Sequence, residues 1–306
     1  MVVCGSVGNC LELGSQARLG AASGMALRYE GARALDEGSS LDVFNAGMIT
    51  GDIRLDSPDS PDSPDSPDSP DSMAAGVVAN LRTSASEFGV LQQGAERYGA
   101  SIVNHGLLQV GAAGRVDQTT IAGDFTQGGD GVLRVDVNFE QQQSDWLLVQ
   151  GGADLGGWLD VTSVALLPGR SVRVLTVDGS ATGTLALRSS PISSYALTRS
   201  EQDYVLDLAP EANLNAADFK LRGNLPALAG HLGRIWRSSA PPLGFGTFFG
   251  AVDQLSVQGA GHCHGLLSGL SPDGLLVPAS HLAGGAPDFW AWRSNARPAP
   301  GYLRAA

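Results

Sequence analysis

Three consecutive residues, His262, Cys263 and His264, are the best candidates for metal chemistry in this chain. Imidazole nitrogens and thiolate sulfurs are zinc ligands, and residues i and i+2 of a β-strand share one face, so the two histidines could bind the same ion. A zinc site normally needs three or four protein ligands, and no partner pair with suitable spacing lies nearby. We therefore predict that the cluster arises by chance and that the chain holds no metal and no other cofactor.

Charged side chains on predicted strands are the second group of candidates. Arg134, Asp136 and Asp160 could act in the cleavage of acidic polysaccharides, a reaction that proteins with stacked strands catalyse through Asp and Arg or Lys on an exposed strand face. Acid and base catalysis needs two carboxyl groups at a defined separation, and the spacing does not bring these carboxylates together. Outward strand positions are ordinarily charged, so we predict no catalytic residue.

Other catalytic motifs are incomplete. Residues 265–269 (GLLSG) resemble GxSxG with the serine one place late, and residues 244–250 (GFGTFFG) lack the spacing of GxGxxG, so we interpret both as turns. His105 lies in a predicted turn at 104–106, where a solvent-facing histidine is commoner than a ligand or a base. These patterns predict a protein that is not an enzyme.

Composition and charge limit the classes of partner and the cellular location that we expect for the protein. The 306 residues carry a formal net charge of −12, and Lys220 is the only lysine, which excludes nucleic acid as an expected partner. Cys4 and Cys10 either pair in an oxidising compartment or are small apolar residues of the N-terminal segment. No signal peptide precedes Arg18, and no apolar run approaches the roughly 20 residues that span a bilayer.

Short apolar-alternating segments must position all of these side chains. Between Ile121 and Leu208 such segments are separated by Gly, Asp, Asn and Ser, without an apolar stripe of helical length. This pattern favours short strands stacked in coils, and therefore an all-β class, over alternating strands and helices. The residues expected to form inward ladders are Leu133, Val135, Val137, Leu147, Val149, Leu159 and Val161.

Composition also divides the chain into five segments. Residues 1–55 end in a predicted strand–turn–strand unit at 45–55, with a short helical turn at 25–35 as an alternative. Residues 56–72 repeat Asp-Ser-Pro, which predicts an extended linker or surface loop, because proline removes a backbone donor and the aspartates repel one another. Strands are expected through 73–210, although the secondary structure of 77–91 is ambiguous. Segment 211–290 shows helical spacing, and 291–306 is an irregular tail.

Three helices are predicted in segment 211–290. The first begins near Pro226, a favoured first-turn residue, and ends near Arg237. Two shorter helices are expected at 248–255 and 266–270.

Two groups of segments resemble a known family. The first group resembles the C-terminal part of a bacterial autotransporter (type V secretion) passenger, where a right-handed parallel β-helix ends in coils called the autochaperone region. The matching residues are 124–127 (DFTQ), 131–137 (GVLRVDV), 144–151 (SDWLLVQG) and 153–157 (ADLGG). The second group resembles the connector between passenger and translocating barrel. Its residues are 213–216 (NLNA), 228–236 (LAGHLGRIW), 246–249 (GTFF), 255 (L), 270–273 (LSPD) and 278–279 (PA).

The resemblance implies a fold, a location and partners. It implies a right-handed parallel β-helix with a small helical connector, an outer-membrane β-barrel translocator as partner, a location at the cell surface and a host or cell-surface ligand. The family's C-terminal barrel and its export signal are missing here, so we expect a truncated, non-enzymatic, adhesin-like passenger whose coils assist folding during secretion. The alternative is a β-helical carbohydrate-active enzyme, a polysaccharide lyase or hydrolase.

Overall fold

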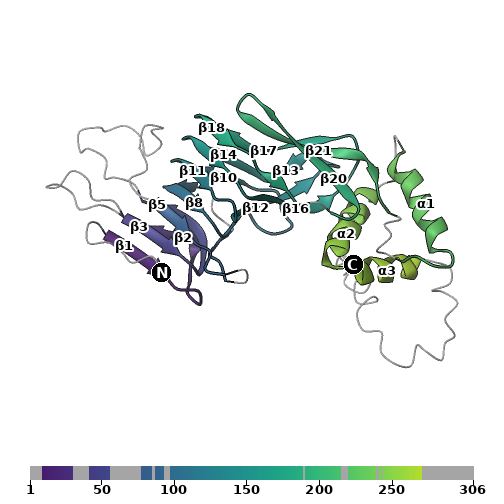
Figure 1. Ribbon diagram of the computed structural model, residues 1–306, viewed down its shortest axis with the longest axis horizontal. Coiled ribbons are helices and arrows are strands. Elements are labelled where there is room, and N and C mark those ends of the chain that lie inside the picture. Colours follow the sequence, from purple (N-terminus) through teal and green to yellow (C-terminus); the bar gives the residue numbers. More distant parts are fainter. Residues whose placement is uncertain are drawn as a thin grey trace, which may run out of the picture.

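The chain folds into stacked coils of short parallel strands, followed by helices (Figure 1). The computed structural model describes residues 9–29, 41–55, 77–84, 87–92, 97–188, 190–214, 220–238, 241–242 and 244–270. The Asp-Ser-Pro repeat at 56–72 and the expected tail at 291–306 lie outside these residues.

One face of the coils is a sheet of parallel strands. Its strands, in spatial order, are β1 (Asn9–Leu13), β3 (Leu41–Asn45), β5 (Val77–Asn80), β8 (Ser101–Asn104), β11 (Phe125–Gln127), β15 (Ala153–Leu155) and β18 (Ala181–Gly183). Sequence order and spatial order agree, so each strand lies on its equivalent one coil earlier.

The other two faces belong to one continuous sheet that bends at β4 (Met48–Arg54). The start of β4 pairs with β6 and its end pairs with β7, while β2 (Arg18–Arg28) lies parallel on its other side. The second face continues through β6 (Val90–Gln92), β9 (Leu107–Gln109), β12 (Val132–Asn138), β16 (Trp158–Ala165) and β19 (Ala186–Leu187). The third face comprises β7 (Arg97–Gly99), β10 (Gln118–Ile121), β14 (Trp146–Val149) and β17 (Ser171–Val177).

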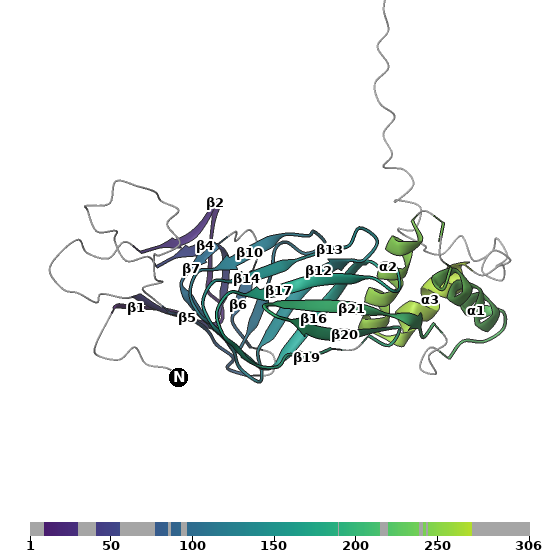
Figure 2. The ribbon, with the colours of Figure 1, turned by 90° about the horizontal axis from the view of Figure 1, so that it is seen from above.

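This arrangement is a parallel β-helix of about five turns, which confirms the predicted fold class. Among the described strands, three antiparallel pairs depart from the parallel pattern. The short β13 (Gln143–Ser144) folds back on β12, and β17 pairs with β21 (Asp203–Ala212), which pairs in turn with β20 (Ser193–Ser200). The hairpin β20–β21 lies between the coils and the helices (Figure 2).

Inward side chains stack on equivalent residues of the next coil and form the core. The ladder of the second face runs through Ile49, Leu91, Leu108, Leu133 and Leu159, and each of these is buried. Burying an aliphatic side chain of this size contributes about 1.5–3 kcal/mol relative to its exposure to water. Stability therefore comes from contacts between neighbouring coils.

The predicted inward residues lie where expected, with one exception. Leu133, Val135, Val137, Leu147, Val149 and Leu159 are fully buried. Val161 is only partly buried. The next strand, β19, pairs with β16 only as far as Leu159, so none of the described strands continues the ladder above Val161.

A ladder of buried amides joins the coils at the corner between the first and second faces. The side-chain Nδ2 of Asn45 donates to Oδ1 of Asn80, and Asn80 donates in the same way to Asn104, both at 2.9 Å. Asn104 continues the series to Oε1 of Gln127 at 3.2 Å. Each of the four amides also donates to a backbone carbonyl at the second-face strand one coil further on, for example Asn80 to Leu107 of β9 at 3.1 Å.

Glycines lie at the same corner, at the residue before each of the second-face strands β4, β6, β9, β12 and β16. Gly89, Gly106 and Gly131 are stacked. The residue after each glycine donates its backbone N–H to the carbonyl of the corresponding glycine one coil earlier, for example Leu107 to Gly89 at 2.9 Å and Val132 to Gly106 at 2.8 Å. A Cβ at Gly106 would overlap the carbonyl oxygen of Gly89 and approach Nδ2 of Asn80. Only glycine permits this close approach of successive coils.

The C-terminal helices confirm the predicted helical segment and extend it. They are α1 (Leu225–Trp236), α2 (Phe245–Gln258) and α3 (Ala260–Leu270). Pro226 lies in the first turn of α1, and the helix is capped at Arg237, as predicted. The second and third helices start earlier than the predicted 248 and 266.

The strands observed in the N-terminal half test three further predictions. The alternative of a helical turn at 25–35 is wrong for residues 25–28, which belong to β2. The unit expected at 45–55 is present, and its apolar residues Ile49, Ile53 and Leu55 are buried. The ambiguous segment 77–91 contains β5 and the start of β6.

The corner predicts a position-specific effect of a single methyl group. We expect Gly106→Ala to lower the free energy of unfolding by about 1–3 kcal/mol, because the added Cβ forces two coils apart. Gly129→Ala is the matched control, since no atom lies within 4 Å of its Cβ position, and it should change stability by less than about 0.5 kcal/mol. Urea unfolding followed by circular dichroism measures both, and equal effects would contradict the corner model.

Candidate functional site

A groove lies between the second face of the β-helix and helix α2. It has a volume of about 310 Å³ and is bordered by β12, β16 and residues 253–258 of α2. The charged residues in its lining are Arg134, Asp136, Asp160 and Asp253. The structure therefore brings together the three charged residues that were considered, and not chosen, as catalytic candidates.

Arg134 and Asp160 form an ion pair across neighbouring strands. They are register partners in β12 and β16, and both Nε and Nη2 of Arg134 donate to Oδ2 of Asp160, at 3.0 and 2.8 Å. A second guanidinium, that of Arg188, approaches the same oxygen at 4.0 Å. The Asp160 carboxylate is thus already engaged by two guanidinium groups.

Asp136 faces a backbone loop. It is 2% exposed, and its Oδ2 accepts a hydrogen bond from the backbone N–H of Gly114 at 2.5 Å. Burial raises the pKa of Asp136, although backbone donors from Gly114 and Arg115 act in the opposite direction. The carboxylate therefore holds the loop at 111–117 against β12.

Asp145, which the sequence analysis did not select, plays a similar part. Its two oxygens accept from the backbone N–H groups of Asp117 and Asp136, each at 2.8 Å, and the residue is fully buried. Burial raises the pKa of Asp145 to about 7, and the charges of Asp136 and Asp117 act in the same direction. No sequence signal distinguishes this aspartate from others that precede an apolar strand.

Asp253 anchors α2 to the last coils. It is 2% exposed and accepts hydrogen bonds from the hydroxyls of Ser163, Ser190 and Tyr195. The helix approaches the strand closely, because a Cβ at Gly250 would lie 2.7 Å from the carbonyl oxygen of Val164. The carboxylate is therefore saturated by donors from β16, β20 and the loop before β20.

The carboxylates of this groove thus already have hydrogen-bond or ion-pair partners within the protein. Asp136 and Asp253 are buried and hydrogen-bonded, and Asp160 is held by Arg134. A glycosidase of either stereochemical class needs two carboxyl groups free to face the substrate. The arrangement fits structural roles better than catalytic ones.

The histidine candidates are not brought together by the fold. His105 lies at the predicted turn and hydrogen-bonds to Asp130, with Nδ1 and Oδ1 2.8 Å apart, and both side chains are about half exposed. His262 and His264 belong to α3, so the assumption that they share a strand face is wrong, because helical residues two apart point in different directions. The GLLSG motif at 265–269 also lies in α3 and is not a turn.

The remaining sequence candidates have simple structural positions. Gly244 adopts a left-handed conformation, φ 86°, as the N-cap of α2, so the predicted turn exists there, whereas Gly246 and Gly250 are helical. Cys10 is disulfide-bonded, and Cys4 lies outside the described part of the chain. This agrees with the pairing alternative for Cys10 without identifying its partner.

The buried Asp145 predicts a pH-dependent stability. Its native pKa of about 7 lies above the value of about 3.9 in an unfolded chain, so the unfolded state loses this proton first and stability falls as pH rises from about 4 to 7. We expect a decrease of up to about 4 kcal/mol from this group. Asp145→Asn should flatten the dependence measured by urea unfolding between pH 4.5 and 7.5. The exposed Asp154→Asn should leave the slope unchanged, and an equal slope in wild type and Asp145→Asn would contradict the assignment.

Within the described residues, no group of three or more His, Cys, Asp or Glu side chains is arranged to hold a metal ion. None of the described helices is long and apolar enough to cross a membrane. Comparison of the chain with protein-family models and with curated proteins finds no match.

Proposed function

We propose that the chain is a non-enzymatic, adhesin-like surface β-helix of the type V secretion class, whose C-terminal coils form the folding nucleus. The observation that carries the proposal is the asymmetry of the two ends of the β-helix. At the C-terminal end, β17 is closed by the antiparallel hairpin β20–β21, and α2 packs on β16. At the N-terminal end, β1 and β2 each pair on one side only among the described strands.

The C-terminal cap has the contacts expected of a nucleus. Trp236 of α1 is buried, its ring meets Phe249 of α2 edge-on at 4.9 Å, and its Nε1 donates to the carbonyl of Pro210 at 3.0 Å. Together with the hydrogen bonds of Asp253, these contacts join α1, α2 and the hairpin to the last coils. A capped end of this kind offers a finished template on which earlier coils can stack.

The positions of the resembling segments support the same proposal. Residues 124–157 form β11 to β15, the coils that would correspond to the autochaperone region, and residues 228–236 fall within α1. The disulfide at Cys10 also supports an oxidising compartment, since such bonds persist in exported proteins. In the proposal, the chain acts at the cell surface, an outer-membrane translocator is its partner, and a host or cell-surface molecule is its ligand.

Folding order tests this proposal. Pulse-labelling hydrogen exchange during refolding of the whole chain should show protection first in peptides from β16, β17, β20, β21 and α2, and later in those from β3 and β5. The reason is that the buried side chains of Trp236, Phe249 and Asp253 join the hairpin and the helices to the last coils at the capped end. Mass spectrometry of the labelled peptides measures the order, and earlier or simultaneous protection of β3 and β5 would exclude a C-terminal nucleus.

Two adjacent residues supply the variants for this experiment. Leu147→Asp places a charge in the fully buried ladder, between Thr119 and Leu175, and should delay protection in every coil. Leu148→Asp changes the neighbouring, outward position of the same strand, and should leave the order and the rate nearly unchanged.

A carbohydrate-active β-helical enzyme is the second candidate function. One observation favours it: Arg134, Asp136 and Asp160 line the same groove. The burial of Asp136 and the ion pair of Asp160 weigh against it, because neither carboxylate is free to approach a glycosidic bond.

Product release distinguishes the two functions. We expect no reducing ends or unsaturated products when the purified chain is incubated with polygalacturonate, alginate or a neutral glucan. Release that is reproducible and is abolished by Asp160→Asn or Asp136→Asn would establish the enzyme and refute the first proposal. Thermal melts of both variants show whether a loss reflects unfolding.

A further inference from the structure

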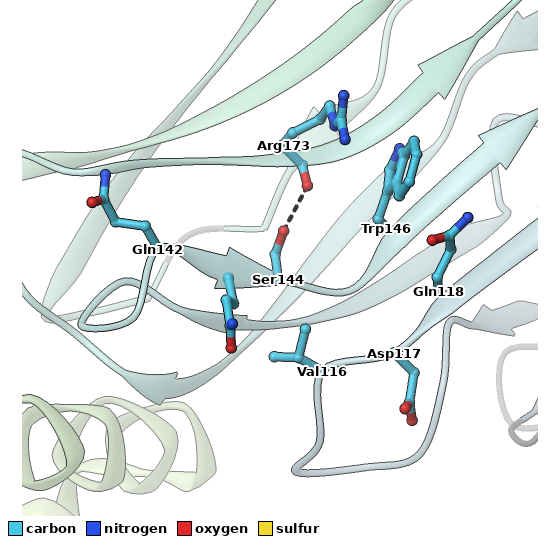
Figure 3. A pocket seen from close by; sticks show the side chains of 8 residues that line it. Val116, Asp117, Gln118, Gln142, Ser144, Trp146 and Arg173 are labelled. Carbon is cyan, nitrogen blue, oxygen red and sulfur yellow. Dashed lines mark hydrogen bonds between the residues drawn. The ribbon is translucent and has the colours of Figure 1, made fainter.

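A second, larger groove lies on the third face of the β-helix. It has a volume of about 540 Å³ and is bordered by the loop before β10, the β13 hairpin and β17 (Figure 3). Its lining contains an unusual number of side-chain amides, from Gln118, Gln142 and Gln143. We call it the amide groove; its other lining residues are Val116, Asp117, Ser144, Trp146 and Arg173.

The wall of the amide groove is a row of three side chains, of which Trp146 and Arg173 are held in place by contacts. Gln118 and Trp146 are register partners in β10 and β14, and the guanidinium of Arg173 in β17 stacks 4.1 Å from the centroid of the Trp146 ring. In Figure 3, Trp146 lies between Arg173 and Gln118. The indole Nε1 donates to Oγ1 of Thr176 at 2.9 Å, which fixes the orientation of the ring.

The three glutamine amides of the groove are available for hydrogen bonds to a ligand. Gln118, Gln142 and Gln143 are exposed, and none of their side-chain amides has a hydrogen-bond partner among the described residues. By contrast, the amide of the neighbouring Gln141 is bonded to Asn138 at 3.2 Å. A free glutamine amide offers two N–H donors and one carbonyl acceptor at the same place, which matches a pair of sugar hydroxyls.

The backbone holds one of these amides at a conformational cost. Gln142 has φ of 54°, the left-handed region that non-glycine residues seldom occupy. Glycine would adopt this conformation without strain, yet glutamine stands here. Such strain is concentrated at binding and catalytic sites, where a side chain is needed at a particular position.

The charges in the amide groove cancel locally. Arg173 pairs with Asp203 at 3.5 Å, and Asp117 pairs with Arg115 at 3.7 Å. The remaining polar groups are neutral, and the whole chain carries a net charge of −12, which disfavours an anionic polymer. Because Arg173 covers one face of Trp146, recognition depends on hydrogen bonds to the amides more than on stacking against the ring.

From these observations we propose that the amide groove binds a neutral oligosaccharide through Gln118, Gln142 and Gln143. The free amides supply the hydroxyl contacts, and Trp146 and Arg173 form a rigid wall beside them. The inference is independent of export, of the folding role proposed above and of the groove beside α2.

Calorimetric titration of the intact chain tests the site. The probes are cellohexaose, maltohexaose and xylohexaose, with a galacturonate hexamer as the anionic comparison. We expect at least one neutral probe to bind, and its affinity to fall tenfold or more in Gln142→Gly and in Gln143→Ala. Gln142→Gly is the sharper variant, because glycine accepts the left-handed conformation and should keep or raise stability while removing the amide.

The control variant comes from the same loop. Gln141→Ala removes an amide that does not line the groove and should leave the affinity unchanged. The proposal is overturned if none of the three neutral probes binds, if the galacturonate hexamer binds more tightly than they do, or if binding survives both Gln142→Gly and Gln143→Ala.

Discussion

The close approach of successive coils at one corner is the constraint on which the structure depends. Strands of neighbouring coils must lie about 4.7–4.9 Å apart, and the stacked glycines before the second face leave room for nothing larger than hydrogen. The buried amides of Asn45, Asn80, Asn104 and Gln127 then complete one another only when each coil is in register. An apolar ladder tolerates a shift of two residues better, since inward positions two apart in a strand can both be apolar, as Leu133 and Val135 are. The amide ladder does not, because a shift leaves buried polar groups without partners.

Much of this fold is predictable from alternation, because burial of every second residue is a strong local pattern. Leu133, Leu147 and Val149 follow it, and Val161 departs from it only where the next strand is too short to cover it. The corner itself also has a signal, Asn-x-Gly, at 45–47 and 104–106. Inserted residues separate Asn80 from Gly89, and between Gln127 and Gly131 both the amide side chain and the spacing are longer, so the repeat is hard to recognise from the sequence alone.

The helices and the buried carboxylates depend on tertiary contacts that the local sequence pattern does not predict. Four glycines lie at 259–269, the first just before helix α3 and three within it, so helix propensity contributes little to its stability. The helix is stabilised mainly by packing, as the complete burial of Leu267 indicates. Asp136 stands between two inward valines, so alternation predicts an outward, solvated carboxylate. A loop more than 20 residues earlier in the chain folds over it, and such a contact leaves no trace in spacing along one strand.

The same carboxylates connect the interior of the β-helix to its surface. Asp136 binds the backbone of Gly114, and Asp145 binds the backbone of Asp117, so both fix the loop that forms one side of the amide groove. Asp145 also receives the N–H of Asp136 on β12, the strand that carries the β13 hairpin and the glutamines of the opposite side. A buried charge that costs stability at neutral pH is therefore placed where it joins the two sides of a surface groove. An apolar residue at this position would leave the N–H groups of Asp117 and Asp136 without acceptors, and an amide has only one acceptor oxygen, so a carboxyl group is the side chain that holds both donors together.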